Sequence, residues 1–139
     1  MKIDFVHIIQ KYRHIIGGFY ALFTSSILIG TLIPGSSLSD YEVFSYDKLM
    51  HLLAFMAWTL GTGICWRAYN DRRAPLKLLV VAPILFGIAI EILQGILPTN
   101  RSPEWIDVVF DALGTLIGLF VYLLLLRIKD KKEGVNFTY

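Results

Sequence analysis

Four long apolar segments limit the folds that are open to this chain. They cover roughly residues 15–33, 49–66, 78–97 and 106–126. A helix needs about 20 mostly apolar residues to cross the hydrocarbon core of a bilayer. Apolar residues make up 55% of the chain and the mean hydropathy is +0.60, which is too high for an ordinary soluble domain. The sequence therefore predicts an all-α integral membrane protein, built as a bundle of four transmembrane helices.

The segments between the apolar stretches are short, so we expect a single transmembrane domain over residues 1–139. Pro34 and Gly35 follow the first stretch and Pro98 follows the third, as residues that end helices do. Pro83 lies early in the third stretch and predicts either a kink or a later helix start. Short loops favour antiparallel packing of helices that are neighbours in the sequence.

Basic residues are distributed unevenly along the chain. They gather before the first apolar stretch, between the second and third, and after the fourth: Lys2, Lys11, Arg13, Arg67, Arg72, Arg73, Lys77, Arg127, Lys129, Lys131 and Lys132. The other two loops hold only Lys48 and Arg101, among several acids. Because Lys and Arg are enriched in cytoplasmic loops, we expect both termini to be cytoplasmic, including a basic tail over residues 127–139. The loop that holds Arg101 should then face outward.

Ionisable side chains stand inside the predicted membrane helices, where they are energetically costly. Asp111 lies six residues beyond Trp105, and Glu91 lies six residues before Leu97. At 1.5 Å per residue, both are roughly 9 Å below the ends of their helices, and His51 is at roughly 7–8 Å. Three helices should therefore bring ionisable groups to one level near the outer face, which favours a functional site.

Spacing along each helix places these groups on shared faces. Residues four apart lie on one face of a helix, as do Asp47 with His51 and Asp107 with Asp111. Glycines continue the same faces, and small residues at such positions let helices approach closely. The glycines expected at helix contacts are Gly87, Gly95, Gly114 and Gly118. The carboxylates should therefore point to where the helices meet and not toward lipid.

The neighbouring loops supply counter-charges to this level. Arg101 can fold over the polar groups and pair with a carboxylate, and Lys48 can do the same. The candidate binding residues share the outer level: Asp47, Lys48, His51, Glu91, Gln94, Arg101, Asp107 and Asp111. The candidate catalytic residues are His51 as a general base and Glu91 or Asp111 as an acid. The alternative is an ion-pair network that only locks three helices together.

A divalent metal ion is a further alternative at this level. His51, Glu91 and Asp107 offer one imidazole and two carboxylates, which suit a hard or borderline ion. However, the chain has no local signature such as H-E-x-x-H, so we expect no bound metal. It also has no Gly-rich phosphate loop and no nucleic-acid motif, so nucleic acid is not an expected partner.

Three ordered motifs run through the candidate residues. They are D-K-x-x-H from residue 47, E-x-x-Q from residue 91, and R-x5-D-x3-D-x2-G-x3-G from residue 101. In order and spacing, these motifs resemble those of the VanZ-like family of membrane proteins. The resemblance implies a multi-pass protein of the bacterial inner membrane with a role in the cell envelope. The namesake of that family is linked to teicoplanin resistance.

Three functional classes remain open. In the first, the protein binds or screens an envelope ligand at its outer face and gives glycopeptide tolerance. In the second, it is a small membrane enzyme that modifies an envelope lipid or glycan, with His51 and the carboxylates as acid and base or as metal ligands. In the third, it is a structural membrane subunit. The expected partners are membrane lipids, a lipid-linked cell-wall precursor or a lipoglycopeptide.

Overall fold

The computed structural model describes residues 5–33, 47–70, 72–98 and 103–133, and helices account for most of this part of the chain. The helices are α1 (Phe5–Lys11), α2 (Arg13–Leu32), α3 (Asp47–Asn70), α4 (Leu76–Ile96) and α5 (Trp105–Glu133). The last four are long and apolar enough to cross a membrane. The predicted fold class is confirmed: the chain is an all-α, multi-pass membrane protein with four candidate spans.

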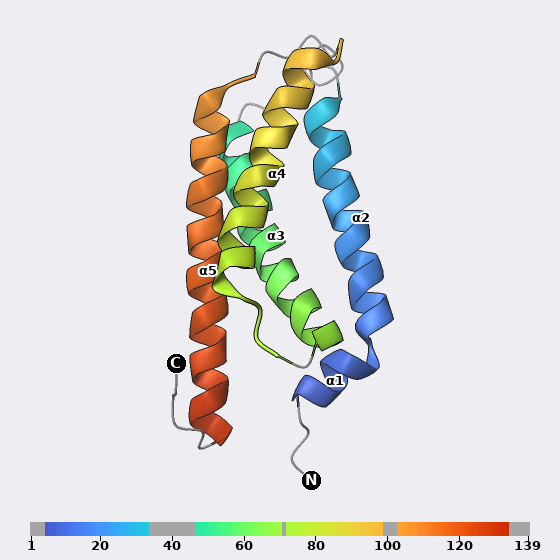
Figure 1. Ribbon diagram of the computed structural model, residues 1–139, viewed down its shortest axis with the longest axis vertical. Coiled ribbons are helices and arrows are strands. Elements are labelled where there is room, and N and C mark those ends of the chain that lie inside the picture. Colours follow the sequence, from blue (N-terminus) through green and yellow to red (C-terminus); the bar gives the residue numbers. More distant parts are fainter. Residues whose placement is uncertain (1–4, 34–46, 71, 99–102, 134–139) are drawn as a thin grey trace.

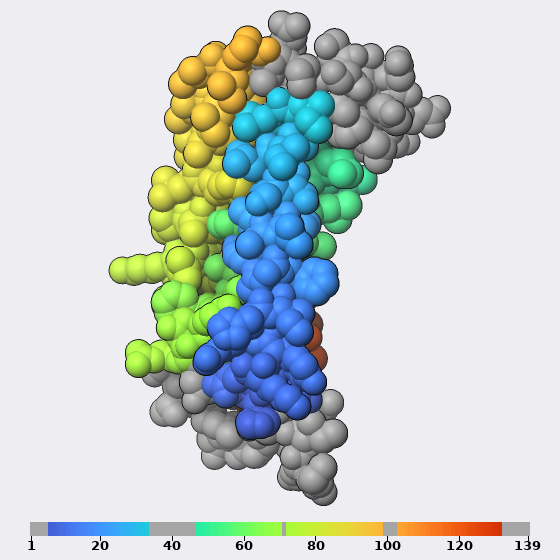
Figure 2. Space-filling model, turned by 90° about the vertical axis from the view of Figure 1, so that its right-hand side faces the viewer, coloured from blue at the N-terminus to red at the C-terminus, as the bar shows by residue number. Residues whose placement is uncertain are grey.

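The four long helices run alternately up and down (Figure 1). At one end of the bundle, α2 and α4 finish and α3 and α5 begin; we call this the polar end. The link between α3 and α4 lies at the opposite end, together with α1 (Figure 1). The closest pair is α3 and α5, with α4 against α5, while α2 packs on α3 and α4 and keeps one face open (Figure 2).

Some helix bounds differ from those expected. The last helix continues through residues 127–133, which the sequence analysis assigned to the basic tail. Those residues are mostly good helix formers, and Asp130 is tied to Arg73 by an ion pair of 2.6 Å. The third long helix begins at Leu76, so Pro83 lies inside it and does not delay its start. The short helix α1 was not anticipated, because seven residues carry too little pattern.

Glycines allow the backbones of α3 and α5 to touch. A Cβ atom added at Gly114 would overlap the carbonyl oxygen of Leu52, and one at Gly118 would lie 2.5 Å from the carbonyl oxygen of Met56. Neither position has room for a Cβ atom, because real Cβ atoms do not approach other atoms so closely. This close approach brings the first turns of α5 against the first turns of α3, and the carboxylates of α5 come with them.

Aromatic and hydroxyl side chains attach α2 to the rest of the bundle. Trp58 of α3 stacks on Phe86 of α4, with ring centroids 5.0 Å apart. The indole Nε1 of Trp58 donates to Thr24 Oγ1 at 2.9 Å, and Tyr20 shares a hydrogen bond of 2.6 Å with Thr62. These contacts lie in the middle of the membrane-spanning region, where buried polar groups need partners. They hold the middle of α2 against α3, while the C-terminal end of α2 lies farther from α3 (Figure 1).

Candidate functional site

The polar end of the bundle buries four ionisable side chains. His51 lies one turn into α3, Asp107 and Asp111 lie in the first turns of α5, and Glu91 lies near the end of α4. Taken as whole residues, each of the four is at most 5% exposed. Groups of this kind are rarely buried unless they are paired or have a function.

His51 and Asp111 form the central contact. His51 Nδ1 lies 2.9 Å from Asp111 Oδ1, and both side chains are buried. Room for this contact comes from α4, since a Cβ atom at Gly87 would overlap the Asp111 carboxylate. With Asp111 ionised, its carboxylate can only accept; Nδ1 is then the donor, and the lone pair of a neutral ring is on Nε2. Asp111 therefore fixes both the orientation and the tautomer of His51.

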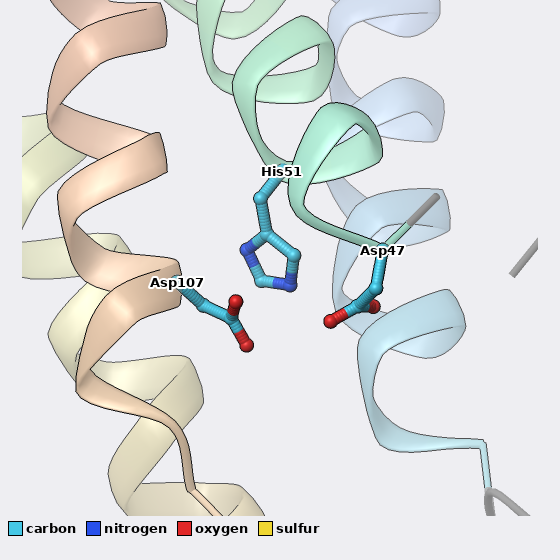
Figure 3. Close-up of side chains that lie close together, drawn as sticks. All are labelled: Asp47, His51 and Asp107. Carbon is cyan, nitrogen blue, oxygen red and sulfur yellow. The ribbon is translucent and has the colours of Figure 1, made fainter. Parts of the chain in front are cut away.

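Asp47 and Asp107 lie beside the His51 ring. One donor atom from each of Asp47, His51 and Asp107 can be chosen so that all three lie within 4.8 Å of one another. Figure 3 shows the two carboxylates on either side of the lower edge of the ring, Asp47 from α3 and Asp107 from α5. The i to i+4 spacing of Asp47 and His51 on α3 explains their shared face. We call these three residues the Asp–His–Asp cluster.

Lys48 lies at the rim of this cluster. Its Nζ atom is 3.0 Å from Glu104 Oε2 and 3.8 Å from Asp107 Oδ1. Both Lys48 and Glu104 are about half exposed, at 43% and 50% of their side chains. A pair that water reaches so freely contributes little to stability. Breaking the pair of Lys48 with Glu104 therefore costs little.

Glu91 and Gln94 bond to backbone groups of neighbouring helices. Glu91 Oε2 accepts a hydrogen bond of 2.7 Å from the backbone N–H of Glu104, which immediately precedes α5. Gln94 Nε2 donates to the carbonyl oxygen of Thr31, in the last turn of α2, at 2.8 Å. Both contacts satisfy backbone groups at helix ends, which lack partners within their own helices. The two residues of the E-x-x-Q motif thus fix the start of α5 and the end of α2 around the site.

The remaining expectations concern Arg101, Gly95 and the candidate metal-ligand trio. Arg101 lies outside the described residues. Gly95 is exposed, and a Cβ atom there would meet Pro103 at an ordinary distance of 3.4 Å, so Gly95 is not at a close contact between helices. The group of donor atoms within 4.8 Å of one another comprises Asp47, His51 and Asp107 and does not include Glu91.

A groove between α2 and α3 leads to the cluster, and sequence reasoning did not anticipate it. Its volume is about 410 Å³. Its walls are mostly apolar or small side chains, and they include Phe23, Ser26, Ile27, Gly30, Thr31, Met50, Leu53, Ala54, Phe55 and Ala57. Asp47 and His51 line its polar end. The only sequence signal for the groove is the set of small residues that line it on both helices, such as Gly30 on α2 and Ala54 on α3.

Comparison with known proteins yields one match. A family model described as VanZ/LLP1 matches residues 8–126, which is most of the chain and includes all the residues of the polar site. No curated protein and no solved structure matches the sequence.

Proposed function

The chain belongs to the VanZ/LLP1 family, and we propose that it binds an amphiphilic molecule of the cell envelope at its polar end. The ligand is a lipid-linked cell-wall intermediate or a glycopeptide-type antibiotic, and its capture gives glycopeptide tolerance. One observation carries the proposal: the apolar groove between α2 and α3 ends on the ionisable side chains of Asp47 and His51. A ligand that fills both parts must itself have an apolar and a polar part.

The apolar part of the groove suits one hydrocarbon chain. It follows α3 from Asp47 to Ala57, which is roughly 15 Å at 1.5 Å per residue. A cavity of about 410 Å³ is within the range of small-molecule sites. The open face of α2 adjoins the lipid, so a chain can slide in sideways without leaving an apolar environment. Binding then costs little desolvation and depends on the fit of the chain between the helices.

The polar part selects the head group. The carboxylates of Asp47 and Asp107 accept hydrogen bonds, so they suit hydroxyl, amide and ammonium groups. Lys48 at the rim suits a phosphate or carboxylate. Glycan–peptide precursors on a lipid carrier and lipoglycopeptide antibiotics both combine these groups with a hydrocarbon chain. An outward orientation of this end would place it where such molecules are found.

A second candidate function is a small membrane enzyme that modifies the same kind of molecule. It is favoured by the His51–Asp111 pair, because a buried carboxylate that orients a histidine is an arrangement of general-base catalysis. An enzyme would change the mass of an added lipid-linked substrate, and Asp111→Asn would abolish that change. A binding protein would return the molecule unaltered.

We predict that the polar end faces outward, from the distribution of Lys and Arg. Arg72 and Pro98 are both exposed and lie at opposite ends of α4. Each is replaced by Cys in a Cys65→Ala background, and intact cells are treated with an impermeant thiol reagent. The Cys at 98 should be labelled in intact cells, and the Cys at 72 only after lysis. Labelling in the reverse order would contradict the orientation.

We also predict that Gly30→Leu blocks the groove. Gly30 lines the groove, and a Cβ atom there meets nothing within 4 Å, so the larger side chain enters free space and the fold is kept. Photolabelling by a diazirine-bearing polyprenyl phosphate should fall at least about tenfold. The reason is that the hydrocarbon chain of the probe loses its apolar contacts in the blocked groove. A parallel assay with teicoplanin distinguishes the two kinds of ligand.

Gly18→Leu is the matched control for this experiment. It makes the same change on the same helix, at an exposed position with nothing within 4 Å and outside the groove lining. Gly18→Leu should label like the parent with both probes. Equal labelling of the two variants would show that the groove does not hold the ligand.

A further inference from the structure

The Asp–His–Asp cluster has the dimensions of a metal site. Donor atoms of Asp47, His51 and Asp107 lie within 4.8 Å of one another. Ligand atoms lie roughly 2.0–2.4 Å from a bound divalent ion, so two of them are at most about 4–5 Å apart. One ion between the three side chains can therefore reach all of them after small rotations of the carboxylates.

A buried carboxylate oxygen in the cluster independently indicates a cation. The side chain of Asp107 is only 7% exposed, and its Oδ1 has no hydrogen-bond donor among the residues that the structure describes. The Nζ of Lys48 lies 3.8 Å away and is already bonded to Glu104 at 3.0 Å. The carboxylate is turned toward His51, into the space between the three side chains (Figure 3). Burying such an oxygen without a partner is costly, and a bound cation removes that cost.

Asp111 prepares His51 to bind a metal. Its contact with Nδ1 at 2.9 Å leaves the lone pair of the imidazole on Nε2. In metal sites, a histidine commonly donates its other N–H to a carboxylate, which fixes the ring and makes it a better ligand. The buried Asp111, whose ion pair among the described residues is with His51, has that position here.

We propose that Asp47, His51 and Asp107 bind one divalent transition-metal ion of the Zn²⁺ or Mn²⁺ class, with Asp111 positioning His51. One imidazole with two carboxylates favours these ions over Ca²⁺ and Mg²⁺, which prefer oxygen ligands alone. This reverses the expectation from the sequence, and Asp47 replaces Glu91 among the ligands. Three protein ligands leave coordination positions open, as at metal sites that take up an outside molecule.

The proposed metal site rests on the geometry of the three side chains and does not depend on the proposed amphiphile. It does, however, bear on which head group can bind. Without an ion, Asp47 and Asp107 repel a phosphate; with one, the cluster attracts it. An ion here would therefore make a phosphate-linked lipid a better ligand than a neutral one, if the amphiphile proposal also holds.

Metal binding is tested on the purified, detergent-solubilised protein after removal of metals with a chelator. Zn²⁺ or Mn²⁺ is added alone, without lipid, and bound ion is measured by equilibrium dialysis and elemental analysis. We expect one ion per chain. Co²⁺ should give the visible absorption of an ion with nitrogen and oxygen ligands. The affinity should fall by more than about 100-fold in His51→Gln and Asp107→Asn, and by about 10–100-fold in Asp111→Asn.

Two matched variants control for nonspecific binding. His14→Gln removes an exposed histidine, and Asp130→Asn removes a carboxylate at the opposite end of the bundle. Both should bind like the parent, with melting temperatures recorded for every variant. The proposal is overturned if the parent binds no stoichiometric ion, or if His51→Gln and Asp107→Asn bind as tightly as their controls. Because no lipid is present, either result leaves the amphiphile proposal to its own test.

Discussion

His51→Asn is expected to abolish probe labelling and glycopeptide tolerance while leaving a folded, membrane-inserted protein. The amide of Asn takes the place of Nδ1 and can donate to Asp111 Oδ1, so the buried carboxylate keeps a partner. What the variant loses is the second ring nitrogen, Nε2, to which both proposals assign the binding of ligand or metal. Labelling with the polyprenyl phosphate, tolerance to teicoplanin and abundance in the membrane are measured together.

His51→Leu is the comparison that separates a working site from a structural lock. It leaves Asp111 buried without its partner, which costs about 3–5 kcal/mol for a buried pair. Leu should therefore lower the melting temperature and Asn should not. The His51→Asn, Asp111→Asn double variant should be no worse than His51→Asn alone, because both changes disable one unit. Full tolerance in His51→Asn at normal abundance would show that the cluster is structural.

Gly114→Leu is expected to destabilise the bundle by about 1–3 kcal/mol or more, through overpacking. The added side chain would collide with the backbone carbonyl of Leu52, which cannot move without displacing α3. Because α3 and α5 carry most of the polar cluster, the change should also lower metal and probe binding.

Thermal unfolding in detergent measures this effect, and Gly18→Leu is again the control. A Cβ atom at Gly18 meets nothing within 4 Å, so its replacement tests the cost of the new side chain without a collision. Gly114→Leu should melt well below Gly18→Leu. If the two melted alike, α3 and α5 would not be in backbone contact at Gly114.

The four long helices could be predicted from the sequence because apolar length alone defines a membrane span. The residues of the polar end could also be predicted in part. Depth along each helix follows from a rise of 1.5 Å per residue, so His51, Glu91 and Asp111 could be assigned to one level. Depth does not fix how each helix is rotated against its neighbours. The exchange of Glu91 for Asp47 in the cluster depends on that rotation.

Features made by contacts between distant segments were not predictable. The bond from the Glu104 N–H to Glu91 depends on where the chain enters α5. The ion pair of Arg73 with Asp130 extends α5 beyond the apolar stretch that defined its expected end. The groove depends on how far α2 stands from α3, which no local pattern encodes. Each of these is set by packing, and packing is known only once all the helices are placed together.

We propose that the groove and the cluster form one site for a single amphiphile. Two polyprenyl phosphates test it, one with a diazirine beside the phosphate and one with a diazirine at the far end of the chain. The crosslinked residues are mapped by mass spectrometry. The first probe should label Met50 and its neighbours at the polar end, and the second should label Phe23 or Ala57, deeper in the groove. Phe120 faces the lipid and is 67% exposed. If both probes labelled the groove no more strongly than Phe120, the proposal of a single site would be contradicted.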